Sequence, residues 1–177
     1  MSSRKLMISF ALALSWLLCG CGGSSGPGSP RTTAFAFEGP ALTAEQQQSA
    51  IDSFNFQRDT WALDFGRPAP GPAGVTFVNA PLLANGRAGE TDGKRITVIV
   101  GGFYEAPFVY HELCHMAFGD GPHSDPGWAT WDYRGSELSN YWAIYYGPRR
   151  LVNVKVPVPP ANIAPLPALP LPPPGAP

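Results

Sequence analysis

The sequence of 177 residues is poor in charge, sulfur and histidine. Charged residues make up 14% of the chain and the formal net charge is −1, so the basic surface that a nucleic-acid partner requires is lacking, and we expect no such partner. The chain has three cysteines, two of them close together near the N-terminus, which excludes a disulfide framework for the remainder. A hydrophobic core or a metal ion must therefore stabilise the fold.

The apolar run near the N-terminus, residues 6–18, has 13 residues, fewer than the roughly 20 that a transmembrane helix needs. Arg4 and Lys5 precede it and small residues follow, which is typical of an export signal. Leu18-Cys19-Gly20-Cys21 also resembles the lipobox of bacterial lipoproteins. The resemblance implies cleavage after residue 20, lipidation of Cys21 and a membrane-anchored lipoprotein of the bacterial cell envelope. An ordinary secretory signal is the alternative.

Segments rich in glycine or in proline lie at the two ends of the chain. Residues 22–30 are a Gly/Ser-rich tether, and 10 of the 21 prolines lie in residues 157–177, where polyproline II is favoured over a hydrogen-bonded core. We interpret this tail as a spacer, with a ligand for a proline-binding partner as the alternative. The predicted organisation is a signal peptide (1–20), a lipid-anchored tether (21–33), one domain (34–152) and a Pro-rich disordered tail (153–177).

Within the central segment, periodicity and turn residues predict an α+β domain in which a short β-sheet packs on a helix. Thr43 and Gln46 form a capping-box pattern at the start of the first helix, and Gly119 is placed to end the second. Asp92-Gly93 indicates a turn just before a β-branched run. The predicted elements are a helix over 43–64, strands over 75–79 and 95–100, a helix over 107–118 and, after an aromatic loop, a helix over 136–146.

The second predicted helix carries the pattern His-Glu-x-x-His at His111, Glu112 and His115. The two histidines are four positions apart and so lie about 40° from each other on one helix face, where both imidazoles can reach one cation. Glu112 is rotated about 100° from His111, near the cation without being stacked over it, as suits a general base for metal-bound water. The spacing therefore predicts a metal site with Glu112 as the base.

This motif, inside an apolar helix that follows a short strand, resembles that of the zincin metallopeptidases and, within them, the metzincins. The resemblance covers residues 95–125 and implies a zincin-like fold and a peptide or protein substrate. It also implies one Zn²⁺ ion held by His111, His115 and His123, with residues 95–100 as the edge strand that binds the substrate. In this chain Gly119 comes one residue later and His123 two residues later than in the metzincin pattern, and the methionine turn has no counterpart.

Several residues are candidates for the rest of the site. His123 is the preferred third ligand because imidazole suits zinc and a Gly-Asp-Gly-Pro turn can fold it back; Asp125 and Glu137 are the alternatives. Asp120 or Asp125 could accept a hydrogen bond from a ligand imidazole. Tyr133 is a candidate for stabilising an oxyanion.

The sequence thus predicts an exported, membrane-anchored zinc endopeptidase in which Glu112 is the general base. The alternative is a non-catalytic zinc-binding envelope lipoprotein in which the metal only stabilises a small domain. The sequence carries no signal for the oligomeric state.

Overall fold

The computed structural model describes residues 32–121, 123, 126–146 and 167–169. They form a small α+β domain, as the sequence predicts. The predicted signal peptide and Cys21, and nearly all of the tether and the tail, lie outside the described residues. The strands are β1 (Ala34–Glu38), β2 (Gly74–Val78), β3 (Gly89–Thr91) and β4 (Arg95–Ile99), and the helices are α1 (Ala44–Phe65), α2 (Val109–Phe118) and α3 (Pro126–Tyr145).

The four strands form one sheet in the order β1-β2-β4-β3. β1, β2 and β4 are parallel, whereas β3 runs antiparallel to β4. The expectation that residues 95–100 form an edge strand is therefore wrong: β4 lies inside the sheet and β3 takes the edge. The sequence predicts the turn at Asp92-Gly93 but not β3 before it. The sequence of β3, Gly-Glu-Thr, has no β-branched run that would indicate a strand, and the segment is a strand only because it pairs with β4.

β1 was also missed, although its sequence Ala-Phe-Ala-Phe-Glu alternates with the period of a half-buried strand. The rings of Phe35 and Phe37 stack on the ring of Phe77 in β2, with centroids 5.9 and 5.1 Å apart. These cross-strand contacts fasten β1 to the sheet. The alternation was the signal that could have located it.

Helix α1 begins and ends where the sequence predicts. Its capping box is formed, with the Thr43 hydroxyl accepting from the Gln46 amide at 3.3 Å and the Gln46 side chain accepting from the Thr43 amide at 2.8 Å. It ends at Gly66 in the left-handed conformation. Phe54 and Trp61 are its largest buried apolar side chains and contribute to the core.

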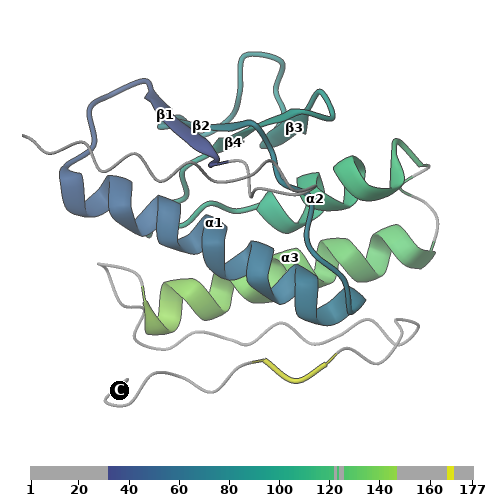
Figure 1. The fold of residues 1–177 in the computed structure, drawn as a ribbon. Coiled ribbons are helices and arrows are strands. Elements are labelled where there is room, and N and C mark those ends of the chain that lie inside the picture. The colour runs from purple at the N-terminus through teal and green to yellow at the C-terminus, as the bar shows by residue number, and fades with distance from the viewer. Residues whose placement is uncertain (1–31, 122, 124–125, 147–166, 170–177) are drawn as a thin grey trace, which may run out of the picture.

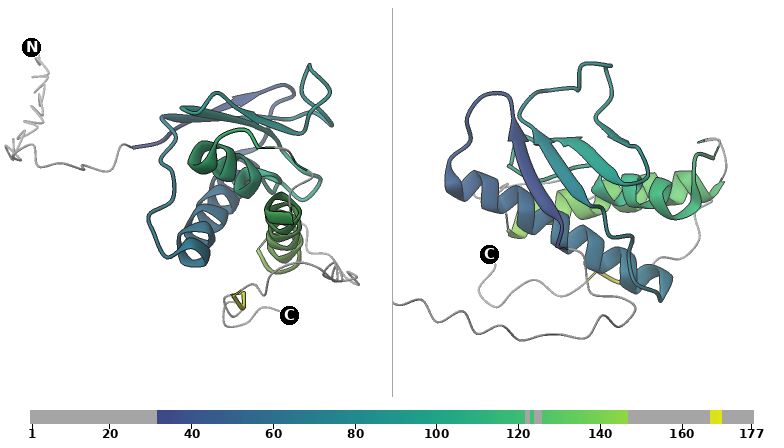
Figure 2. Two further views of the ribbon diagram at one scale, coloured as in Figure 1. Left: turned by 90° about the vertical axis from the view of Figure 1, so that its right-hand side faces the viewer. Right: turned by 45° about the horizontal axis from the view of Figure 1, so that its top comes forward.

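All three helices lie on one face of the sheet, with α2 next to the strands and α1 and α3 beyond it (Figures 1 and 2). α2 contacts β3, β4, α1 and α3, so its residues are surrounded by the other elements. The prediction of a sheet packed on this helix is confirmed. Among the described residues, no helix is both long and apolar enough to cross a membrane.

Helix α3 begins ten residues earlier than predicted, at Pro126 instead of Ser136, so the expected aromatic loop is helical. Gly127 and Gly135 weaken the helical signal of this segment. Tertiary packing overrides it, because the indole of Trp131 stacks on Phe118 of α2 with centroids 4.7 Å apart. The indole of Trp128 lies against the rings of the three histidines, 4.3 to 5.2 Å between centroids.

Candidate metal centre

Helix α2 begins at a corner that α1 stabilises. Phe108, the residue before the helix, has a positive φ of 68° and provides no side-chain cap. The buried Gln57 of α1 takes this role: its Nε2 donates to the carbonyl of Ala106 at 2.6 Å, and its Oε1 accepts from the amide of Tyr110 at 3.1 Å. These two hydrogen bonds position the first turn of α2, which carries His111.

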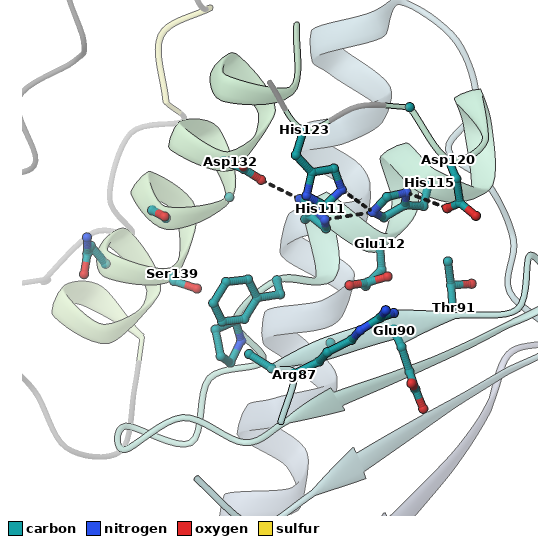
Figure 3. A pocket seen from close by; sticks show the side chains of 18 residues that line it. Arg87, Glu90, Thr91, His111, Glu112, His115, Asp120, His123, Asp132 and Ser139 are labelled. Carbon is teal, nitrogen blue, oxygen red and sulfur yellow. Dashed lines mark hydrogen bonds and ion pairs between the residues drawn. The ribbon is translucent and has the colours of Figure 1, made fainter. Parts of the chain in front are cut away.

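The three histidines of the chain converge on one point. The Nε2 atoms of His115 and His111 lie 2.9 Å apart, and those of His123 and His115 lie 3.2 Å apart. Figure 3 shows His111 and His115 on α2, with His123 joining them from the segment that follows the helix. All three ligand atoms lie within 4.8 Å of one another, so the prediction that these histidines can reach one ion is confirmed.

Two carboxylates stand behind the imidazoles. Oδ1 of Asp132 on α3 lies 2.5 Å from Nδ1 of His111. Oδ1 of Asp120 lies 3.1 Å from Nδ1 of His115, an ion-pair distance whose angle falls short of a hydrogen bond. A carboxylate at Nδ1 favours the tautomer with its proton there, and we therefore assign the lone pair to Nε2. Asp120 was a sequence candidate, whereas Asp132 was missed because its place depends on the packing of α3.

The converging nitrogens fit a divalent cation. Lone pairs that face one another at these distances repel unless a cation lies between them. In a tetrahedral zinc site with bonds of about 2.0–2.1 Å, two ligand nitrogens lie about 3.3–3.4 Å apart, close to the spacing observed here. Burial lowers the pKa of His111 and His115, and the lowered pKa favours the neutral imidazole that binds metals. The carboxylates of Asp132 and Asp120 oppose this shift.

Glu112 lies in the first turn of α2, turned toward β3. Its side chain is almost fully buried, and this burial, followed by the charge of Glu90, raises its pKa to about 7, while the guanidinium of Arg87 acts in the opposite direction. Gly89 of β3 makes room for the carboxylate: a Cβ at this position would stand 2.6 Å from Oε1 of Glu112. Arg87 and Gly89 were not among the sequence candidates, because nothing in their spacing links β3 to the helix.

The histidines and Glu112 line one cavity of about 1030 Å³ between α2, α3 and β3 (Figure 3). His123 is exposed at its rim. The cavity continues past His111 along α3, where its wall consists of Ser136, Ser139 and Asn140. The site is thus open enough to admit a molecule larger than water.

The other predicted site residues lie elsewhere. Oε2 of Glu137 accepts from Arg134 at 2.7 Å, and Glu137 is not among the residues that line the cavity. Tyr133 does not line it either. Asp125 lies outside the described residues. Cys114 is fully buried beside the indole of Trp61 and belongs to the hydrophobic core.

Comparison with family models, with curated proteins and with solved structures finds no match to this chain. The likeness to zincins therefore depends on the His-Glu-x-x-His motif and on the arrangement of the residues around it.

Proposed function

We propose that this protein is a zinc-dependent endopeptidase, exported and anchored by lipid at Cys21. The observation that carries the proposal is the convergence of three Nε2 atoms beside a buried carboxylate in an open cavity. Structural zinc sites are closed by four protein ligands, whereas catalytic sites use three and leave a position open. Among the described residues, the only group of converging potential ligands is the three histidines, without a fourth protein ligand. This number favours a hydrolase over a structural zinc site.

The residues of the cavity divide the work of hydrolysis. A zinc ion, when bound by His111, His115 and His123, would polarise a peptide carbonyl and acidify water. Asp132 holds the His111 imidazole in the tautomer that presents Nε2. Glu112 takes a proton from the attacking water and delivers it to the leaving amine, and a pKa of about 7 suits both transfers.

The free edge of β3 supports a peptide substrate. β3 pairs with β4 on one side only among the described strands, and its residues border the cavity. An extended peptide can add to such an edge through main-chain hydrogen bonds. A peptide bound there would pass directly over Glu112, because Gly89 of β3 lies against that carboxylate.

The metal is the first test. We expect about one zinc ion per purified chain. Removal of the ion by a chelator should abolish peptide cleavage while the circular dichroism stays nearly unchanged, since none of the three histidines belongs to the hydrophobic core. His123→Ala should weaken zinc binding, and Lys94→Gln, in an exposed turn, should not. Collapse of the fold on chelation would instead support the structural zinc alternative, and zinc-free protein that cleaves peptides would contradict the proposal.

A second test is Gly89→Ala. The added methyl would push the Glu112 carboxylate from its place while leaving the histidines untouched. We expect a loss of roughly 10²-fold in kcat, because a displacement of about 1 Å can have this effect on a positioned group. Zinc content should not change. Gly102→Ala is the matched control, since no atom lies within 4 Å of the Cβ it would add. Equal activity of the two variants would show that the position of Glu112 is unimportant.

A further inference from the structure

The guanidinium of Arg87 stands in the cavity without a hydrogen-bonded or ion-paired carboxylate among the described side chains. Arg87 is the only lysine or arginine among the described residues that line it. Its guanidinium makes no hydrogen bond or ion pair with any described side chain, although four carboxylates line the same cavity. A guanidinium presents five N–H donors in a planar fork, a geometry that matches a carboxylate.

The four carboxylates are committed to other partners or roles. Asp132 and Asp120 face His111 and His115. Glu90 accepts from the side-chain amide of Asn85 at 2.6 Å, and Figure 3 shows its carboxylate pointing away from the histidines. Glu112 is the proposed base, and within the described residues it forms no ion pair with Arg87, whose side chain extends toward it (Figure 3). Arg87 therefore remains available to an incoming anion.

The backbone around Arg87 fixes where its side chain points. The Arg87 amide donates to the Asn85 side chain at 3.0 Å and its carbonyl accepts from Leu83 at 2.7 Å. Arg87 lines the cavity, and Figure 3 shows its side chain extending toward Glu112.

The wall of the cavity along α3 carries neutral donors. Ser139 and Asn140 line it, and their side chains make no hydrogen bond within the described part of the chain. The Ser139 hydroxyl oxygen is withdrawn from solvent and unpaired, which is costly unless a ligand group compensates. The Arg87 guanidinium itself favours an anionic oxygen pair over a neutral carbonyl, because charge-assisted, bidentate hydrogen bonds are stronger than neutral ones.

We propose that Arg87 is a specificity-determining residue that binds a carboxylate of the substrate, so that the preferred substrates are peptides with a carboxylate close to the cleaved bond. This inference rests on the proposed peptidase function. The carboxylate is either the C-terminus of the peptide or an Asp or Glu side chain, and both present the same planar oxygen pair to the guanidinium.

The test measures binding to the zinc-loaded protein carrying Glu112→Gln, so that no turnover occurs. The probes are acetyl-tetra-alanine with a free C-terminus, its C-terminal amide, and the same amide with one alanine replaced by aspartate. We expect at least one carboxylate peptide to bind about tenfold more tightly than the neutral amide. The preference should vanish when Arg87→Gln is added and persist with Lys94→Gln, which removes the same charge from an exposed turn.

The two carboxylate peptides identify the source of the anion. Equal binding of all three peptides, or a preference that survives Arg87→Gln, would overturn the inference. It would also be overturned if Arg87→Gln, in the protein with Glu112 intact, lowered kcat equally for charged and neutral peptides, because the guanidinium would then serve the transition state. If no peptide binds, the peptidase proposal fails, and titration with sodium succinate then tests the carboxylate site alone. An arginine Nε–H resonance that shifts with succinate, and that is lost in Arg87→Gln, supports the site. If no arginine resonance shifts, the inference is refuted.

Discussion

Replacement of Glu112 by Gln is expected to abolish peptide cleavage and leave zinc binding intact. Glutamine has nearly the same shape but cannot accept and release a proton, and a general base contributes about 10²–10⁴-fold to the rate. The imidazoles of the proposed metal ligands keep their own partners, Asp132 and Asp120, so the metal content should stay the same. Peptide cleavage and metal analysis on the same preparation measure both effects.

Glu90→Gln is the control for this experiment. Glu90 borders the same cavity and has the same side chain, but its carboxylate accepts from Asn85 and points away from the histidines (Figure 3). Its removal should change the rate by much less than that of Glu112. Undiminished turnover in the Glu112→Gln protein would remove Glu112 as the base and with it the proposed mechanism.

Replacement of Asp64 by Asn is expected to give the largest loss of stability, about 3–5 kcal/mol in the free energy of unfolding. The Asp64 carboxylate is 5% exposed and accepts from Nε and Nη2 of Arg134 at 2.8 and 2.9 Å and from the Tyr110 hydroxyl at 2.9 Å. Burial and this carboxylate raise the pKa of Tyr110, so its hydroxyl remains a donor. The substitution leaves the guanidinium of Arg134, 1% exposed, without its main counter-charge.

Asp59→Asn provides the matched comparison, because Asp59 is 69% exposed and forms an ion pair with Arg58 on the surface. Its loss should lower the free energy of unfolding by no more than about 0.5 kcal/mol. Urea denaturation of both variants gives the two values. The buried cluster joins α1, α2 and α3 through Asp64, Tyr110 and Arg134. Equal effects of the two substitutions would show that the buried cluster contributes no more to the free energy of unfolding than a surface ion pair.

Local signals predicted the elements that local interactions stabilise. The capping box at Thr43 and the glycine after Phe118 act on neighbours within a few residues, and the β-branched runs carry their own preference for strands. These elements formed where expected. β3 and the start of α3 were missed for the opposite reason. A strand of three residues exists only because β4 pairs with it, and the first turns of α3 depend on Trp128 and Trp131 packing against α2.

The candidate site divides in the same way. One turn of helix brings His111, Glu112 and His115 together, so their spacing in the sequence determined both the metal-binding face and the neighbouring carboxylate. Asp132, Gly89 and Arg87 come from a helix and a strand distant along the chain, and only tertiary packing places them beside that turn. The sequence by itself determined the pair of histidines and the carboxylate beside it, because helical periodicity is a local property. Only the folded structure decided which carboxylate orients His111, which strand borders the cavity and which arginine lines it. Those contacts join segments far apart along the chain, and no local sequence pattern encodes them.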